Sequence, residues 1–214
     1  MVHNADQDPR EGISMNRILV AYTTNSGSTE EVARAVAEEL AKNGDTVNVQ
    51  RLEEVHDLET YQAVVIGAPM ILGWHPAAQK FVKKNRETLK NIRVAYFATA
   101  MSLTQLDENH TDGVSVYVDP YLALPPKRAG RLSIKENYAT VTNYLRPILK
   151  AAPAVKPVSA AFFGGKLELF RLNFFQMLFV MVVIQTQPGD KRNWSAIQEW
   201  AGNLRTIFQE TDRY

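Results

Sequence analysis

The chain has 214 residues, of which 45% are hydrophobic and 22% charged, values ordinary for a globular protein with a sizeable core. It contains no cysteine, which excludes disulfides, thiolate catalysis and cysteine-held metal or iron–sulfur centres, and its four histidines show no paired ligand spacing. The formal net charge of +1 does not favour nucleic-acid binding, and the N-terminus lacks the apolar core of a secretory signal, so we expect a cytoplasmic protein.

The first sixteen residues are polar and contain Pro9 and Gly12. We therefore expect residues 1–16 to form a flexible extension and residues 17–214 to form one domain. From Ile18 onwards, short apolar runs alternate with helical stripes. The apolar runs predict buried strands at Ile18–Tyr22, Tyr61–Gly67, Ile92–Ala98 and Pro157–Phe163, with an edge strand at Thr46–Arg51. The stripes predict helices at Glu30–Lys42, Ala77–Leu89, Tyr138–Lys150 (stopped or kinked at Pro147) and Trp194–Phe208.

Strict alternation of strands and helices predicts an α/β fold with a parallel sheet and right-handed crossovers. Five strands in one domain favour the doubly wound order 2-1-3-4-5, with helices on both faces. In such sheets, ligands bind at the carboxyl ends of the strands, near the switch point between strands one and three. Three ligand loops are therefore expected, at Thr23–Thr29, Ala68–His75 and Thr99–Gln105.

The first of these loops is rich in hydroxyl groups and directly precedes a predicted helix. Its candidate residues are Thr23, Thr24, Asn25, Ser26, Gly27, Ser28 and Thr29. Free N–H groups and a partial positive charge at the helix start favour an anion, and Gly27 allows close backbone approach. The loop matches neither GxxxxGK[ST] nor GxGxxG and contains no lysine or arginine. It therefore suits a single phosphate, as in FMN, although an ordinary N-cap at Ser28 or Thr29 is an equal alternative.

The second loop is strongly apolar for a surface connection. Its candidate cofactor residues are Pro69, Met70, Ile71, Leu72, Gly73 and Trp74. An exposed Trp74 beside aliphatic side chains would suit the face of a flat aromatic ring; the alternative is that Trp74 packs against the following helix. We expect His75 at the helix start or the surface. The third loop contributes Thr99, Ala100, Met101 and Ser102, and it contains no acidic residue before Asp107.

The stretch Val20–Val36 resembles the phosphate-binding signature of the flavodoxins. The matching positions are Tyr22, Thr24, Gly27, Thr29, Ala33 and Val36, whereas Ala21 stands where a larger apolar residue is usual. Residues 61–85, 160–184 and 193–204 are similar to the flavodoxin-domain proteins that include the menaquinone-dependent protoporphyrinogen oxidases. The resemblance runs from about Asn16 to the C-terminus and is weakest between Met101 and Gly130. It implies FMN, redox chemistry and, in some members, oxidation of a tetrapyrrole precursor with electrons passed to quinone.

Two insertions, near residues 107–137 and 166–184, depart from a plain flavodoxin pattern. The first has a strand-like pattern at Val114–Val118 and predicts either a lid or substrate wall over the cofactor, or a solvated segment. Seven basic residues and one acid lie between Pro125 and Lys156. They suit substrate carboxylates, an acidic partner, anionic lipid or simply a solvated face. The stretch Leu167–Ile184 predicts a helix unsuited to spanning a membrane. Protein burial, a homodimer interface and peripheral contact at the inner face of the membrane all stay open for it.

The sequence offers no Ser–His–Asp set, paired carboxylates or metal site, so we assign no catalytic residue and leave the chemistry to the cofactor. Our hypothesis is an FMN-dependent oxidoreductase that passes electrons from a reduced organic substrate to a quinone or similar acceptor. Its partners would be a quinone and a hydrophobic or tetrapyrrole-like small molecule. The alternatives are an electron-carrier flavodoxin with a redox protein as partner, and a non-redox protein that has lost the flavin. The near-neutral charge, the basic residues between Pro125 and Lys156 and the apolar second insertion count against the carrier.

Overall fold

The computed structural model describes residues 16–71, 73–106, 110–128, 130–167 and 189–210. Expectations about residues 1–15, and about nearly all of the 166–184 insertion, lie outside these residues. The strands are β1 (Arg17–Tyr22), β2 (Thr46–Arg51), β3 (Ala63–Pro69), β4 (Arg93–Ala100), β5 (Leu103–Thr104), β6 (His110–Thr111), β7 (Val114–Val118), β8 (Ala123–Leu124), β9 (Ser159–Gly164), β10 (Lys166–Leu167) and β11 (Gly189–Asp190). The α-helices are α1 (Ser28–Leu40), α2 (Pro76–Lys84), α3 (Arg86–Leu89), α4 (Ile134–Tyr138), α5 (Val141–Ala151) and α7 (Trp194–Glu210).

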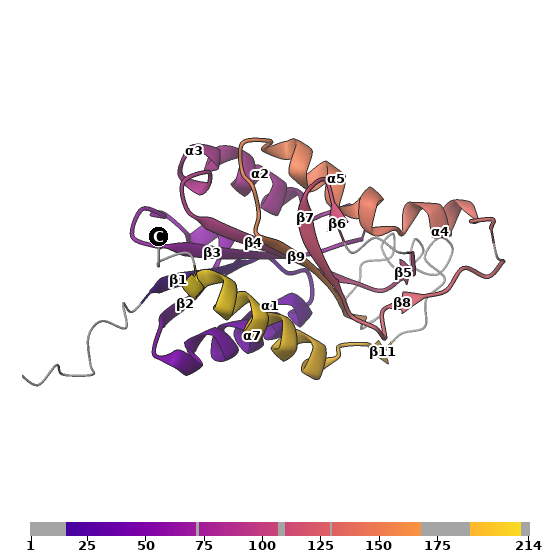
Figure 1. Cartoon of the computed structure of the whole chain (residues 1–214), viewed down its shortest axis with the longest axis horizontal. Helices are drawn as coiled ribbons and strands as arrows, with labels where there is room; N and C mark the ends of the chain where they lie inside the picture. The colour runs from indigo at the N-terminus through magenta and orange to yellow at the C-terminus, as the bar shows by residue number, and fades with distance from the viewer. Residues whose placement is uncertain (1–15, 72, 107–109, 129, 168–188, 211–214) are drawn as a thin grey trace, which may run out of the picture.

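A central sheet with the order β2-β1-β3-β4-β9-β7-β6 forms the middle layer (Figure 1). The first five strands are parallel neighbours, which confirms the predicted order 2-1-3-4-5. The strand-like pattern at Val114–Val118 is also confirmed, because β7 extends the sheet beyond β9 in parallel, and β6 closes that edge in antiparallel pairing. The sheet is therefore wider than predicted by two strands from the first insertion.

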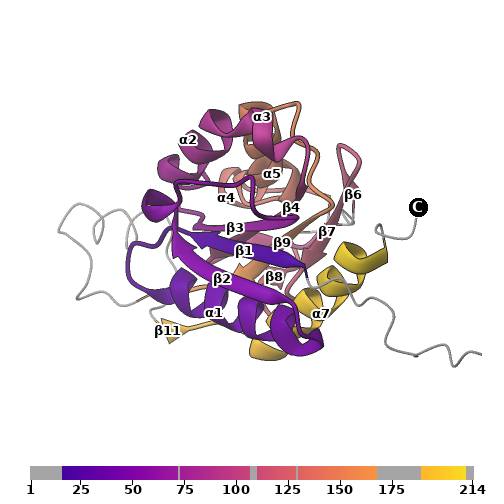
Figure 2. The same cartoon turned by 90° about the vertical axis from the view of Figure 1, so that its left-hand side faces the viewer.

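Helices cover both faces of this sheet, as Figure 2 shows end-on. On one face, α1 and α7 pack against each other and against a core built around Phe97, Phe163 and Trp200. On the other face, α2 and α5 cover a second core that contains Trp74 and Tyr96. Because both faces are buried, the central strands are continuously apolar rather than alternating. Among the described helices, none is long and apolar enough to cross a membrane.

Two helices end or begin away from their predicted positions because side chains compete for backbone groups. The expected helix Ala77–Leu89 is split at Asn85, whose Nδ2 donates to the Phe81 carbonyl oxygen 2.9 Å away. The expected helix Tyr138–Lys150 begins instead at Val141, because the hydroxyl of Thr140 caps it by accepting the N–H of Asn143. Pro147 does not stop α5, which continues to Ala151.

An arm formed by residues 121–138 extends from the sheet and contains β8, α4 and their connection (Figure 1). Its root is fixed where β5 pairs with β8 in parallel. At the same place Thr104 bonds twice to the end of the arm: its N–H donates to the Ala139 carbonyl at 2.6 Å and its hydroxyl to the Glu136 carbonyl at 2.7 Å. The arm is therefore anchored at β5, which lies in the third predicted ligand loop.

The carboxylate of Glu136 stabilises the arm through a capping box. It accepts the N–H of Lys127 at 2.7 Å, and the N–H and hydroxyl of Ser133 at 2.8 and 2.7 Å. The Lys127 N–H and the Ser133 hydrogen bonds lower the pKa of Glu136 from 4.5 to about 2. Because the folded pKa is depressed, this stabilisation is present above pH 4.5 and is lost as the pH falls towards 2.

We therefore expect Glu136→Gln to lower the thermal midpoint at neutral pH, and the difference from the wild type to shrink as the pH falls towards about 2. Melting curves of both proteins across this pH range measure the effect. A difference that stays constant with pH would show that the Glu136 charge does not stabilise the arm.

Candidate cofactor site

The loop between β1 and α1 leaves the start of α1 without a side-chain cap. Gly27 occupies the N-cap position with φ +91°, a left-handed conformation that suits glycine, and no side chain caps the helix. The alternative of an N-cap at Ser28 or Thr29 is therefore wrong. The Gly27 N–H donates instead to the hydroxyl of Thr24 at 2.9 Å. Several N–H groups at the start of α1 thus have no partner within their own helix, which is the arrangement that binds anions.

Thr29, in the first turn of α1, contacts the third loop instead of capping the helix. Its hydroxyl lies 2.9 Å from the hydroxyl of Thr99, and both side chains are buried. The contact joins the first predicted loop to the end of β4, although the two residues are 70 positions apart in sequence. Thr29 therefore positions two ligand loops relative to each other.

The second loop turns two of its apolar side chains into the core. Met70 and Trp74 form an antiparallel bridge around Gly73, whose φ is +106°, and the Met70 N–H donates to the Thr99 carbonyl at 2.8 Å. The expectation of an exposed Trp74 is wrong, since its side chain is only 2% exposed and its ring lies 5.3 Å from that of Tyr96. Ile71 is the exposed member of the loop, and Leu72 lies outside the described residues.

Since Trp74 supports the loop from inside the core, Trp74→Phe should leave the affinity for a bound cofactor close to that of the wild type. Its indole Nε1 is buried without a hydrogen-bond partner, so loss of that group costs little stability. Titration with FMN measures the affinity. The comparison variant, Ile71→Ser, removes the exposed apolar side chain of the loop. It should weaken FMN binding more than Trp74→Phe does. A stronger loss from Trp74→Phe would show that the indole contacts the ligand.

His75 caps the start of α2, as expected for a residue at the helix start. Its Nδ1 accepts the N–H of Ala77 at 3.2 Å, which requires that nitrogen to be unprotonated. Burial also lowers the pKa of His75 below 6.5. The residue is therefore a neutral cap at neutral pH.

The third loop is held through its backbone carbonyl groups. The Ala100 carbonyl accepts the Gly165 N–H at 2.8 Å, the Met101 carbonyl accepts Nζ of Lys191 at 3.2 Å, and the Ser102 carbonyl accepts the Tyr144 hydroxyl at 3.4 Å. The contact with Lys191 brings the chain that follows the second insertion to this loop. Sequence reasoning missed it, because no local pattern links residues 90 positions apart.

A buried carboxylate, which the sequence did not predict, links the ends of two strands near the third loop. Asp119 is fully buried and accepts the Tyr121 N–H at 2.9 Å, Nδ2 of Asn193 at 3.0 Å and the Gly164 N–H at 3.3 Å. It therefore joins the ends of β7 and β9 to the start of α7. The only available signal was the Asp–Pro pair at Asp119, which indicates a turn but not burial.

Arg192 links the start of α1 to the chain that precedes α7. Its side chain is 5% exposed, and its guanidinium lies 2.6 Å from the carboxylates of both Glu31 and Asp190. It also lies 4.6 Å from the centre of the Trp194 ring. Because Glu31 is in the first turn of α1, this contact fixes the helix start against the chain that precedes α7.

The structure thus brings together the start of α1, Ile71 and the backbone of residues 99–102 at the carboxyl ends of β1, β3 and β4. The donors present suit a phosphate monoester: uncapped helix N–H groups, hydroxyls and a glycine at positive φ, with no basic side chain in residues 23–29. Within the described part of the chain, no group of three or more His, Asp or Glu side chains is placed to hold a metal ion.

A family model described as a flavodoxin domain matches residues 19–193. The chain is 32% identical over 122 residues to protoporphyrinogen IX dehydrogenase (quinone) of Escherichia coli K12, and the match covers 55% of this chain and 66% of that relative, just under two thirds. It is also 32% identical over 85 residues to an NAD(P)H dehydrogenase (quinone) of Acidovorax ebreus, covering 29% of this chain and 42% of the relative. Among solved structures, a flavodoxin from the domain Archaea is 10% identical, with a TM-score of 0.49 over 90% of this chain and 99% of that one.

Proposed function

This chain belongs to the flavodoxin domain family, and we propose that it is an FMN-dependent oxidoreductase that takes electrons from a reduced organic substrate and delivers them to a quinone or similar acceptor. The observation that carries the proposal is the uncapped start of α1 at Gly27, beside hydroxyl groups and at the switch point of the parallel sheet. FMN, when bound, supplies reversible transfer of electrons or hydride.

The phosphate of FMN would bind at residues 23–29. The backbone N–H groups at the start of α1 supply donors and a partial positive charge. The hydroxyl of Thr24 already accepts the Gly27 N–H, so its own hydrogen remains available to an anion. Ser26 and Ser28 add further hydroxyl groups in the same loop. Because residues 23–29 include no lysine or arginine, the loop favours one phosphate over a di- or triphosphate.

The flavin ring would lie between the second and third loops, at residues 69–74 and 99–102. Ile71 offers an exposed apolar side chain, and the Met70–Thr99 backbone bond keeps the two loops together. Trp74 would act beneath the loop and not against the ring. The described residues of the third loop carry no acid, so we expect less repulsion of a negatively charged flavin than an acidic loop would cause.

The names of two relatives support the proposed substrate class. The E. coli relative is named for protoporphyrinogen IX and quinone, and the Acidovorax relative for quinone. A hydrophobic, tetrapyrrole-like donor and a quinone acceptor are therefore the first pair to test. The competing function is an electron carrier that serves a redox protein and has no substrate of its own.

In the first step of the test, FMN is titrated into the purified protein, and titration calorimetry measures its binding. Protein that takes up no FMN would contradict both redox functions. Flavin-loaded protein is then mixed with protoporphyrinogen and a menaquinone analogue, and product formation is followed by porphyrin fluorescence. Turnover supports the proposal. No turnover, combined with electron transfer between a reductase and a protein acceptor, supports the carrier instead.

A further inference from the structure

The most exposed of the large apolar residues that the structure describes lie on the arm. Seven large hydrophobic residues are exposed, and the three most exposed are Ile134 (93%), Tyr121 (78%) and Leu124 (59%). Tyr138, also exposed, lies four residues after Ile134 and therefore on the same face of α4. Exposing apolar side chains to water costs free energy. Several such side chains on one segment therefore indicate an interaction surface.

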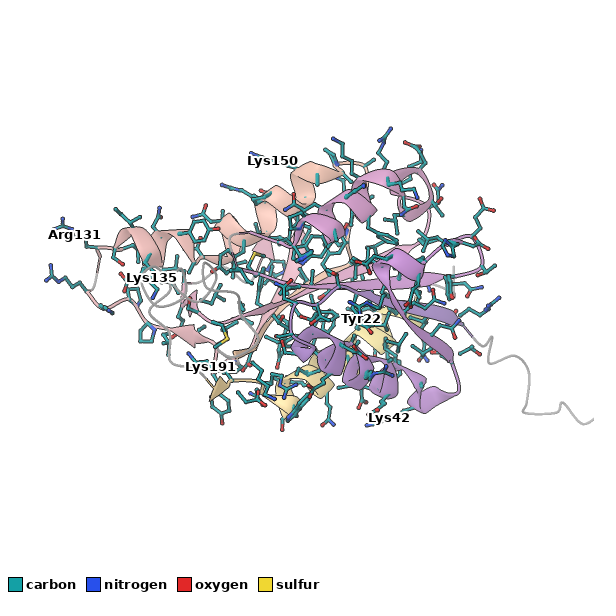
Figure 3. The ribbon with its side chains drawn as sticks, turned by 180° about the vertical axis from the view of Figure 1, so that it is seen from behind. Tyr22, Lys42, Arg131, Lys135, Lys150 and Lys191 are labelled. Atoms are coloured by element: carbon teal, nitrogen blue, oxygen red, sulfur yellow. The ribbon has the colours of Figure 1, made fainter. Side chains whose placement is uncertain are left out.

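The same arm is strongly basic. Between residues 121 and 138 the chain carries four cations and one acid, a net charge of +3 in a protein whose total is only +1. The cations are Lys127, Arg128, Arg131 and Lys135. Figure 3 shows Arg131 at the far end of the arm and Lys135 nearer to the body. The single acid, Glu136, accepts hydrogen bonds from the N–H groups of Lys127 and Ser133, and the net charge of +3 already includes its negative charge.

We infer that the arm docks on the surface of an anionic lipid bilayer. Tyrosine and aliphatic side chains beside lysine and arginine suit the boundary between headgroups and acyl chains. A single protruding side chain such as Ile134 is suited to insertion between lipids, whereas a protein partner usually requires a broader packed patch. Charge complementarity selects anionic lipid, because each lysine or arginine near such a surface contributes about 1 kcal/mol.

The position of the arm relates docking to the candidate site. The arm is rooted at β5, which begins one residue after Ser102, the last candidate residue of the third loop. A quinone dissolved in the bilayer would therefore meet the site from this side. That link rests on the proposed function, whereas docking itself does not.

The experiment is flotation of the full-length, FMN-loaded protein with vesicles, without substrate or quinone. Vesicles of phosphatidylcholine mixed with phosphatidylglycerol are compared with pure phosphatidylcholine. We expect binding to the anionic vesicles that weakens with added salt. Arg128→Gln combined with Arg131→Gln should weaken it about 30-fold, and Ile134→Ser about 10-fold.

The matched control is Lys83→Gln with Lys84→Gln, which removes two exposed cations from α2, away from the arm. It should leave vesicle binding unchanged. Equal loss from the control pair, no preference for anionic vesicles, or a concentration-dependent dimer abolished by Ile134→Ser would each overturn the inference. Vesicle binding by protein that takes up no FMN would leave it standing and would contradict only the proposed function.

Discussion

Gly67→Ala is expected to lower the free energy of unfolding by about 2–3 kcal/mol. A Cβ atom at Gly67 would lie 1.9 Å from Cζ of Phe97, the residue paired with it on β4. The Phe97 ring cannot retreat easily, because it is 1% exposed and lies 6.2 Å from the ring of Phe163 and 6.4 Å from that of Trp200. The added methyl therefore forces strain on the centre of the core.

This substitution should reach the candidate site as well. The Gly67 carbonyl accepts the N–H of Thr23 at 3.0 Å, so any shift of β3 moves the start of the first loop. We expect weaker FMN binding in the folded fraction. Urea unfolding followed by circular dichroism measures stability, and titration below the transition measures affinity.

Gly202→Ala provides a control with the opposite sign. Gly202 lies inside α7, and a Cβ there would come no closer than 3.7 Å, to a side-chain oxygen of Glu39. Because alanine favours the helix, this variant should be more stable by about 0.5–1 kcal/mol. If Gly67→Ala is as stable as the wild type, the close approach of Gly67 and Phe97 does not constrain the packing of the core.

Local patterns were sufficient to predict the five central strands of the sheet and the position of the first loop. Continuous apolar runs mark strands covered on both faces, so β1, β3, β4 and β9 are readable from residue type alone. The loop at residues 23–29 is likewise a local feature, because its hydroxyls, glycine and helix start are contiguous. What the sequence could not provide is the partner of each side chain.

Trp74 and Asp119 illustrate that limit. An apolar loop can place its aromatic ring outwards or inwards, and only the bridge around Gly73 and the nearby Tyr96 ring decide that Trp74 points inwards. Asp119 looks like a surface turn residue until its three donors, two of them distant in sequence, are known. The contacts of Lys191 and Arg192 depend in the same way on segments that meet only in the folded chain.

Asn25→Asp is expected to weaken FMN binding roughly 10- to 30-fold while leaving the protein folded. Asn25 is exposed in the first loop, and the two side chains have the same shape, so the change adds one negative charge beside the proposed phosphate position. Repulsion between the two charges weakens binding. The same charge near the start of α1 interacts favourably with the helix dipole, so stability without FMN should be equal or slightly higher.

Three further variants separate charge from other effects. Asn25→Ala removes the amide donor without adding charge and should cost less affinity than Asn25→Asp. Asn25→Lys should bind FMN at least as tightly as the wild type. Asn203→Asp places the same charge at an exposed position of α7 and should have no effect. Calorimetric titrations at low and high salt measure all four, and the effect of Asn25→Asp should shrink with salt. If Asn25→Asp and Asn25→Lys bind FMN equally, the phosphate does not lie at the start of α1.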